Sequence, residues 1–398
     1  MSAGYFARVV PALALLGGAA AASACPFCSG PSLTLSEQVD RSDVALFVAW
    51  RETSKPSPDG SRLAWTKYEV LETLPGRDRG LSPGDVVTAI DYQPSEAGRS
   101  YLLTGYFDGI DEKVIWDPPT ELPRGGFGYV RDAPSPEEPT PDRLRYFVRF
   151  LEHGENAVAN DAYGEFANSP YEKIASIADA MPREDLARWV ADEEIDPARL
   201  GLYGLLLGTC GGPDEAGLLG EIVLAPSDDI RIGLNGLMSG YLLAAGEPGL
   251  EKLVELKLAA ETVPGPDGEP VDVPFSETYA AMQAVGFLWT YARDRFEDEA
   301  ILAAMRTLLD RPDMADFAVR DLARWKDWSI GDRLFAMYGR DGQPPAVRRA
   351  IVRYYLAATK DAADHPTEAA AARAHLEELT ELDPETVEDV RSYELLFD

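Results

Sequence analysis

Hydrophobic and polar positions follow two different periods in the two parts of this chain. In residues 25–132, short apolar runs alternate with proline, glycine, serine and aspartate, and several runs place apolar side chains at every second position. About five to seven short strands at this spacing are typical of a small barrel or sandwich. A helix is also expected at 32–41, with Ser36 as its cap. The strands are expected at residues 43–50, 63–71, 86–90, 101–106, 114–116 and 127–130.

The period changes after residues 133–141, a stretch rich in proline and acidic residues that is predicted to be a linker. From there to residue 398, apolar residues recur three and four positions apart, which predicts α-helices. The first helix begins with Asp142 as its cap and ends at Gly154. Residues 261–275, which are rich in proline and glycine, are expected to form a loop. Later helices are expected at 276–291, 297–309, 314–327, 330–338, 346–359, 367–380 and 384–395.

The helical part contains one internal repeat. Residues 199–208 match residues 231–240 at an offset of 32 positions, and three glycines occupy the same places in both copies. A repeat of that length fits one helix–turn–helix unit of a solenoid. Because glycine costs about 1 kcal/mol against alanine inside a helix, its presence in both copies predicts that neighbouring helices approach closely there. The expected fold class is therefore α+β with two domains, a small β-barrel at 25–132 and a HEAT-like helical array at 142–398.

Residues 1–24 have the order of a secretory signal. Arg8 is the only charge before an apolar run, which ends in the small residues Ala22, Ser23 and Ala24. The run is short for a membrane span, so no span is expected after the signal is removed. Cleavage after Ala24 predicts a protein exported to the periplasm or beyond, with Cys25 first. A lipid anchor on Cys25 and a retained membrane anchor are the alternatives.

Composition restricts the class of partner. The chain has 68 acidic and 37 basic residues and a net charge of −31, which repels phosphate backbones and anionic membrane surfaces. We therefore expect no nucleic-acid partner. Only three cysteines are present, so apolar burial must stabilise the core, and 45% hydrophobic residues are sufficient for it.

The order of motifs in the β part resembles that of the netrin-like domain, the OB-type barrel of netrin tails and tissue inhibitors of metalloproteinases. The matching segments are Cys25 near the start, the strand at 43–48, Tyr68-Glu69-Val70, 81–86 and 98–103. The resemblance implies an OB-type barrel. In the inhibitor branch, an N-terminal cysteine chelates a protease metal through its free amine and carbonyl, a role that would fall to Cys25. The order of export signal, Cys-Pro-Phe-Cys, small β domain and helical repeats resembles a family of exported bacterial HEAT-repeat proteins. This resemblance implies an architecture and no activity.

Cys25 and Cys28 form the tetrapeptide Cys-Pro-Phe-Cys, which is also the glutaredoxin-type active-site motif. That fold needs a strand directly before the motif, whereas only the signal precedes Cys25 here. A zinc site would need two further ligands, and the chain has only three histidines. We predict a structural disulfide. A modified Cys25 and redox or metal chemistry are the alternatives.

The densest group of aromatic and cationic residues is predicted to be a binding patch with aromatic anchors. The alternative is that its tryptophans belong to the core while its cations face solvent. A similar group is formed by Arg348, Arg349, Arg353, Tyr354 and Tyr355. The predicted patch consists of Arg320, Arg324, Trp325, Lys326, Trp328 and Arg333.

Recognisable catalytic parts are missing from the sequence. It has no phosphate-binding glycine loop, zinc-protease helix or nucleophile elbow. His153, His365 and His375 are expected to be exposed, and Cys210 to be a buried small apolar side chain. We therefore predict an exported, non-enzymatic protein that binds a protein or peptide partner without a cofactor. The alternatives are a metal-chelating or protease-inhibiting module that uses a free Cys25, and a thiol oxidoreductase.

Overall fold

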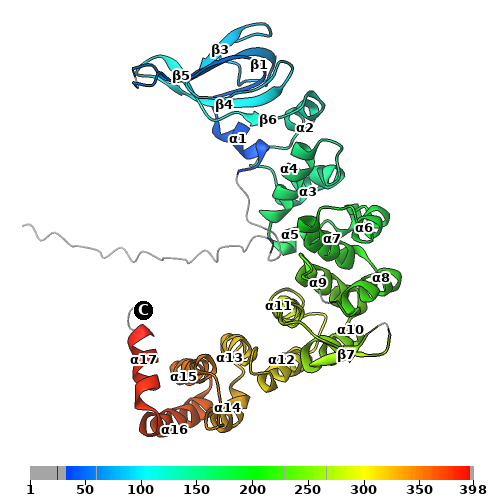
Figure 1. Cartoon of the computed structure of the whole chain (residues 1–398), viewed down its shortest axis with the longest axis vertical. Coiled ribbons are helices and arrows are strands. Elements are labelled where there is room, and N and C mark those ends of the chain that lie inside the picture. The colour runs from blue at the N-terminus through cyan, green and yellow to red at the C-terminus, as the bar shows by residue number, and fades with distance from the viewer. Residues whose placement is uncertain (1–24, 26–32, 60, 228, 266, 395–398) are drawn as a thin grey trace, which may run out of the picture.

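The computed structural model describes residues 25, 33–59, 61–227, 229–265 and 267–394. An antiparallel sheet at the N-terminal end is followed by helices that continue to the C-terminal end, in a curved arrangement (Figure 1). The main sheet contains β1 (Val44–Ser54), β2 (Trp65–Thr73), β3 (Val86–Ala89), β4 (Ser100–Asp108), β5 (Lys113–Trp116) and β6 (Thr120–Glu121). This arrangement confirms the predicted α+β fold class.

The helices extend from one side of the sheet to the C-terminal end. The α-helices are α1 (Leu35–Arg41), α2 (Phe127–Arg131), α3 (Thr140–Phe147), α4 (Asn156–Ala167), α5 (Tyr171–Ala175), α6 (Arg183–Val190), α7 (Pro197–Cys210), α8 (Pro213–Leu224), α9 (Leu234–Ala245), α10 (Glu247–Leu253), α11 (Phe275–Tyr291), α12 (Asp298–Thr307), α13 (Ala315–Arg324), α14 (Gly331–Tyr338), α15 (Pro345–Lys360), α16 (Pro366–Leu382) and α17 (Pro384–Glu394). The short helical turns are η1 (Arg124–Gly126), η2 (Val148–Phe150), η3 (Ala178–Ala180), η4 (Val254–Ala259), η5 (Leu308–Asp310) and η6 (Trp328–Ile330), of which η4 is a π-helix.

The strand order of the sheet is β3-β2-β1-β4-β5, and β6 also pairs with β4. The first four strands therefore lie in the spatial order 4-1-2-3, which is a Greek key. OB-type barrels are partly open Greek-key barrels with five strands, and this topology agrees with one. Within the described residues β3 forms one edge of the sheet and β5 and β6 form the other, so the sheet is a half-barrel.

Strand β1 is buried on both faces, which explains its continuous apolar run. Val44, Leu46 and Val48 pack inside the half-barrel, whereas Ala45 and Phe47 belong to the core that the sheet shares with the helices. The ring of Phe47 stacks on that of Phe127 in α2, with centroids 4.2 Å apart. The two layers of the protein therefore meet along β1.

The strand expected at residues 127–130 is wrong, since this segment forms helix α2. Phe127, Tyr129 and Val130 are all buried against the sheet and the first helices. A run this short has apolar residues both two and three positions apart, so its period does not separate a strand from a helical turn. As a helical turn, the segment places Phe127 on the ring of Phe47.

Helix α1 begins two residues earlier than a cap at Ser36 would place it. Its cap is Thr34, which forms a reciprocal capping box with Glu37, so the expectation that Ser36 is the cap is wrong. Ser36 instead donates a hydrogen bond to Glu165 in α4 at 2.7 Å, and that carboxylate pairs with the buried Arg143 of α3. A buried polar cluster therefore holds α1 against α3 and α4.

A second carboxylate connects three helices at this junction. Asp161 in α4 accepts hydrogen bonds from the backbone N–H of Leu35 in α1 and from the hydroxyl of Tyr129 in α2, both at 2.7 Å. Burial raises the pKa of Asp161 to about 7, and the negative charges of Glu165 and Glu37 act in the same direction. The two hydrogen bonds oppose the increase but do not cancel it.

This geometry predicts a pH-dependent junction. Because the folded-state pKa of Asp161 lies above its ordinary value, its contribution to stability is complete below about pH 4 and is lost as the pH rises through about 7. The Tm should therefore fall more between pH 5 and pH 8 in the wild type than in Asp161→Asn, measured by circular dichroism. Glu138→Gln, at an exposed position, is the control, and its Tm should change with pH by the same slope as that of the wild type. Equal slopes for wild type and Asp161→Asn would contradict the assignment.

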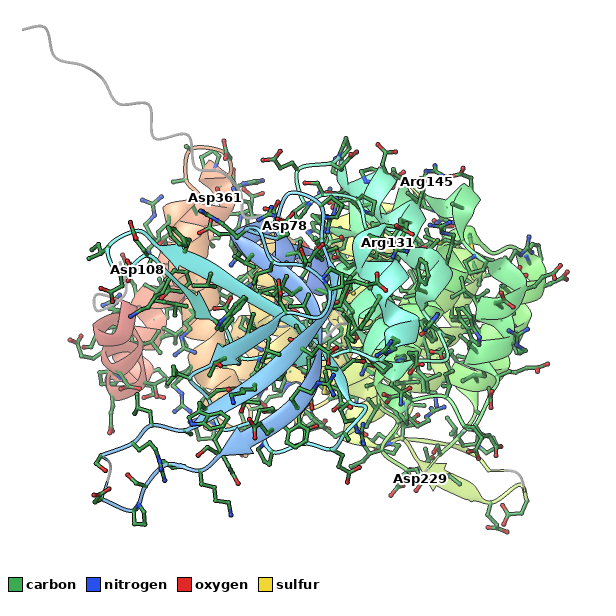
Figure 2. All side chains as sticks on the ribbon, turned by 90° about the horizontal axis from the view of Figure 1, so that it is seen from above. Asp78, Asp108, Arg131, Arg145, Asp229 and Asp361 are labelled. Atoms are coloured by element: carbon green, nitrogen blue, oxygen red, sulfur yellow. The ribbon has the colours of Figure 1, made fainter. Side chains whose placement is uncertain are left out.

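The helices beyond α5 form two rows along the curve. Helices α7, α9, α11, α13 and α15 lie along its inner edge, and α8, α10, α14 and α16 lie along its outer edge (Figure 1). One hydrophobic core runs through the helices and reaches the outer face of the sheet. Arg131, Arg145 and Asp229 are exposed, and their places are labelled in the view from above (Figure 2).

The two copies of the sequence repeat pack directly on each other, in α7 and α9. A Cβ atom on Gly204 would lie 2.6 Å from the Cα of Leu237, and one on Gly208 would overlap the backbone of Gly240. Gly201 likewise faces Gly233. The predicted close approach is therefore confirmed, and glycines of one copy face those of the other because the two helices run parallel.

Other expectations for the helical part hold with small changes. Helices α11 to α17 begin and end within a few residues of the predicted limits. The prediction of a loop at 261–275 is incomplete, since this segment contains a hairpin of β7 (Thr262–Pro264) and β8 (Pro270–Asp272). Every helix within the described residues is too short or too polar to cross a bilayer. The predicted signal lies outside the described residues.

Candidate functional site

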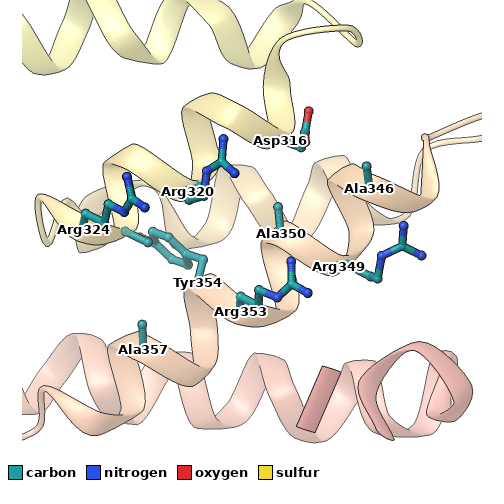
Figure 3. Close-up of a pocket in the computed structure, with 10 residues that line it drawn as sticks. Asp316, Arg320, Arg324, Ala346, Arg349, Ala350, Arg353, Tyr354 and Ala357 are labelled. Atoms are coloured by element: carbon teal, nitrogen blue, oxygen red, sulfur yellow. The ribbon is translucent and has the colours of Figure 1, made fainter. Parts of the chain in front are cut away.

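A groove lined by four arginines runs along the contact between α13 and α15. The two helices run in the same direction, with Arg320 and Arg324 on α13 and Arg349 and Arg353 on α15 (Figure 3). The groove has a volume of about 360 Å³. Its remaining lining residues are Asp316, Ala323, Ala346, Ala350, Tyr354 and Ala357.

Helical periodicity places these arginines in pairs. Arg320 and Arg324 are four positions apart on α13, so they share the face opposite the buried Val319 and Leu322. Arg349 and Arg353 have the same spacing on α15. Small alanine side chains lie between the two pairs, which leaves the groove open.

The arginines of the groove are poorly neutralised. Arg320, Arg349 and Arg353 have no carboxylate oxygen within 4.0 Å in the described part of the chain. Arg324 pairs with Asp321 at 3.2 Å, and Asp316 is the one acidic residue of the lining. Burial raises the pKa of Asp321, so the charged form of this carboxyl group is disfavoured.

Several arginines elsewhere in the protein are paired with carboxylates. Arg145 forms two hydrogen bonds with the carboxylate of Asp179, at 2.8 and 2.9 Å, and Arg306 does the same with Asp327, at 2.6 and 2.9 Å. A carboxylate-rich chain offers such partners readily. The groove is therefore a local positive site on an acidic protein.

Tyr354 forms the floor of the groove and has no free donor. It is 1% exposed, and its hydroxyl donates a hydrogen bond to the backbone oxygen of Asp327 at 2.7 Å. Burial raises the pKa of Tyr354 well above its usual value. The polar contacts that α15 offers a ligand in the groove therefore come from the guanidinium groups of Arg349 and Arg353.

The structure distributes the six residues of the predicted patch among several places. Arg320 and Arg324 line the groove. Trp325 stacks on Trp289 of α11, with centroids 4.8 Å apart. Arg333 pairs with Asp310 at 3.0 Å.

Lys326 and Trp328 form a structural joint. The ammonium of Lys326 and the indole N–H of Trp328 donate to the two carboxylate oxygens of Asp361, at 2.7 and 2.8 Å. Trp328 is buried, and the backbone of Lys326 has φ +59°, which a tight turn requires here. These contacts fix the end of α13 to the end of α15.

The second cationic group of the sequence supplies the opposite wall. Arg349, Arg353 and Tyr354 line the groove, whereas the hydroxyl of Tyr355 donates to the backbone oxygen of Gly331 at 2.7 Å. Sequence reasoning kept the two cationic groups apart. The sequence did contain a pattern that could have predicted the groove. Each helix carries a pair of arginines, and Arg320 and Arg353 are separated by about one repeat length.

The cysteines are held in different surroundings. Cys25 is 4% exposed, and its backbone N–H donates to the oxygen of Ala167 at 3.0 Å. Cys28 lies outside the described residues, so the disulfide stays a prediction. Cys210 is a free thiol, and burial raises its pKa, which disfavours the reactive thiolate.

The histidines are partly buried, so the expectation that all three are exposed is wrong. His153 accepts a hydrogen bond from the N–H of Glu155 at 3.1 Å. His365 contacts Asp361 at 2.7 Å and His375 contacts Asp332 at 3.0 Å. Among the described residues, no three histidine, cysteine or acidic side chains are grouped to hold a metal ion.

No family model and no curated protein matches the chain. The solved structure of human deoxyhypusine hydroxylase in complex with glycerol is 17% identical, with 66% of this chain and 91% of that chain covered and a TM-score of 0.27. At this TM-score the similarity supports no conclusion about function. The helical repeat is instead established by the packing of α7 on α9.

Proposed function

We propose that the protein is an exported, non-enzymatic binding protein whose helical array recognises a protein or peptide partner at the arginine groove. The observation that supports this is the set of three arginines without a carboxylate partner, in a chain with 68 acidic residues. Arginine is enriched among the residues that contribute most binding energy at interfaces, because its planar guanidinium group can form two parallel hydrogen bonds with one acceptor group. An unpaired group of arginines therefore favours binding.

The architecture supports the same function. Stacked helical repeats form extended surfaces that long segments of a partner can follow. The groove lies between two helices of the inner row, so it is part of such a surface (Figure 1). Export follows from the predicted signal and is part of the proposal.

The surroundings of Cys25 weigh against the two alternative functions. Metal chelation would require an accessible amine at Cys25, whereas its nitrogen donates to Ala167 and the residue is buried. Thiol exchange requires an attacking sulfur within reach of a substrate, and burial of Cys25 opposes that. The groove is the better-supported site.

Site-specific photo-crosslinking in the native host tests the proposal. A photoreactive phenylalanine at Ala346, which lines the groove and is exposed, should give one major protein adduct that saturates as expression of the partner is titrated. The same residue at Gly217, exposed on the outer helix α8, is the control and should not give that adduct. Identical adducts from both positions, or none from Ala346, would reject the groove as the contact surface.

A further inference from the structure

The geometry points to a ligand class for the groove: we propose that it binds an extended acidic segment with carboxylates at alternate positions. This inference rests on the proposed function and names the chemistry of the partner at the same site. Three features of the groove carry it, namely the spacing of its arginines, the absence of neutral donors on its floor, and its size.

The spacing of the arginines matches an extended chain. Residues four positions apart on an α-helix are separated by about 6 Å along the axis. Side chains two positions apart on an extended strand point to the same side and are separated by about 6.6 Å. Carboxylates at alternate positions of such a strand would therefore meet both Arg320 and Arg324, or both Arg349 and Arg353.

The chemistry of the lining selects for charge. A guanidinium group binds a carboxylate through two parallel hydrogen bonds, which are stronger than bonds between neutral groups. The hydroxyl of Tyr354 is already used by the backbone oxygen of Asp327, so the floor offers no donor to an amide or hydroxyl ligand. Between the arginines, Ala346, Ala350 and Ala357 allow a peptide backbone to approach closely.

The size of the groove limits the ligand to a few residues. Its volume of about 360 Å³ is at the lower end of ligand pockets, so a short segment fits but a folded surface does not. The net charge of −31 repels an acidic ligand at long range. At physiological ionic strength, however, charges are screened beyond about 8 Å, so the four arginines dominate once the segment is in contact.

A peptide-binding experiment on the full mature chain tests this inference. The probe is a fluorescein-labelled ten-residue peptide of alternating glutamate and serine, and the control peptide has glutamine in place of glutamate. Fluorescence anisotropy at 150 mM NaCl should show saturable binding of the acidic peptide and at least about tenfold weaker binding of the glutamine peptide, since the charge-assisted hydrogen bonds are lost.

Variants locate the binding. The double variant Arg320→Gln/Arg353→Gln should weaken binding of the acidic peptide by about tenfold or more, and Arg320→Lys/Arg353→Lys should give an intermediate loss, since lysine keeps the charge but not the fork. The control is Arg62→Gln/Arg340→Gln, which removes the same charge at exposed positions outside the groove and should bind within about twofold of wild type. Thermal unfolding verifies that each variant is folded.

Several outcomes would overturn the inference. Equal binding of the acidic and glutamine peptides would do so, as would wild-type affinity in the groove double variant. Displacement of the probe by inorganic phosphate at lower concentration than by unlabelled acidic peptide would identify the groove as a phosphate site instead. Self-association in light scattering that the acidic peptide does not disrupt would identify a second copy as the occupant. If crosslinking at Ala346 succeeds while acidic peptides fail to bind, only this inference is lost.

Discussion

Gly240→Ala should destabilise the protein by on the order of 3 kcal/mol, because its methyl group would occupy the place of the Gly204 backbone. A Cβ atom on Gly240 would overlap both the carbonyl oxygen and the carbonyl carbon of Gly204. Backbone atoms cannot rotate away as a side chain does, so α7 and α9 would have to separate. That separation would expose apolar residues of the core that the two helices share.

Urea unfolding followed by circular dichroism measures this effect. Gly217→Ala is the matched control, since Gly217 lies in α8, is exposed and has no neighbouring atom within 4 Å of an added Cβ. That change should stabilise the protein by up to about 1 kcal/mol, through helix propensity alone. A loss below about 1 kcal/mol for Gly240→Ala would show that the helices are not in close contact.

Glu277→Ala should also cost about 3–5 kcal/mol, since it leaves a buried ammonium group without its counter-charge. The Nζ of Lys257 is 2.5 Å from one carboxylate oxygen of Glu277 and 3.0 Å from the backbone oxygen of Ala225. Arg231 donates to the other oxygen of Glu277. Lys257 is 0% exposed and Glu277 is 1% exposed, so water cannot replace the lost partner.

The same experiment has a control and a rescue. Glu255→Ala, an exposed position on the π-helix that carries Lys257, should change the free energy of unfolding by less than about 0.5 kcal/mol. Burial already lowers the pKa of Lys257, so the Glu277→Ala variant should recover part of its loss as the pH rises above neutral. The double variant Lys257→Met/Glu277→Leu should recover most of it, since apolar residues can replace a buried pair. A loss no larger than that of Glu255→Ala would contradict the role of this pair.

The sequence predicted those features that depend on neighbours along the chain. Amphipathic runs identified α11 to α17, because a helical period sustained over eight or more residues has few alternative structures. The glycines of the repeat predicted close packing. Glycine destabilises a helix relative to alanine, and the close approach of a neighbouring helix explains its presence there. Where the run was short, as at Phe127 to Val130, two periods fitted equally and the prediction was wrong.

The groove shows the limit of this reasoning. Its two arginine pairs were visible in the sequence, but as separate groups on separate helices. Which cations meet depends on the direction and register in which α15 packs against α13. The aromatic residues between them, Trp325 and Trp328, were grouped with the patch because they are close in sequence. Their side chains instead contact α11 and the end of α15.

By itself, the sequence determined the α+β class, the change from sheet to helices and the packing of one repeat on the next, since each of these follows from local period and residue size. Tertiary structure alone decided that the sheet is a half-barrel against α2, that Lys257 and Glu277 are buried together, and that four arginines share one groove. The physical reason is that partners of a charged or aromatic group are chosen by packing across the fold, and spacing along the chain does not encode that choice.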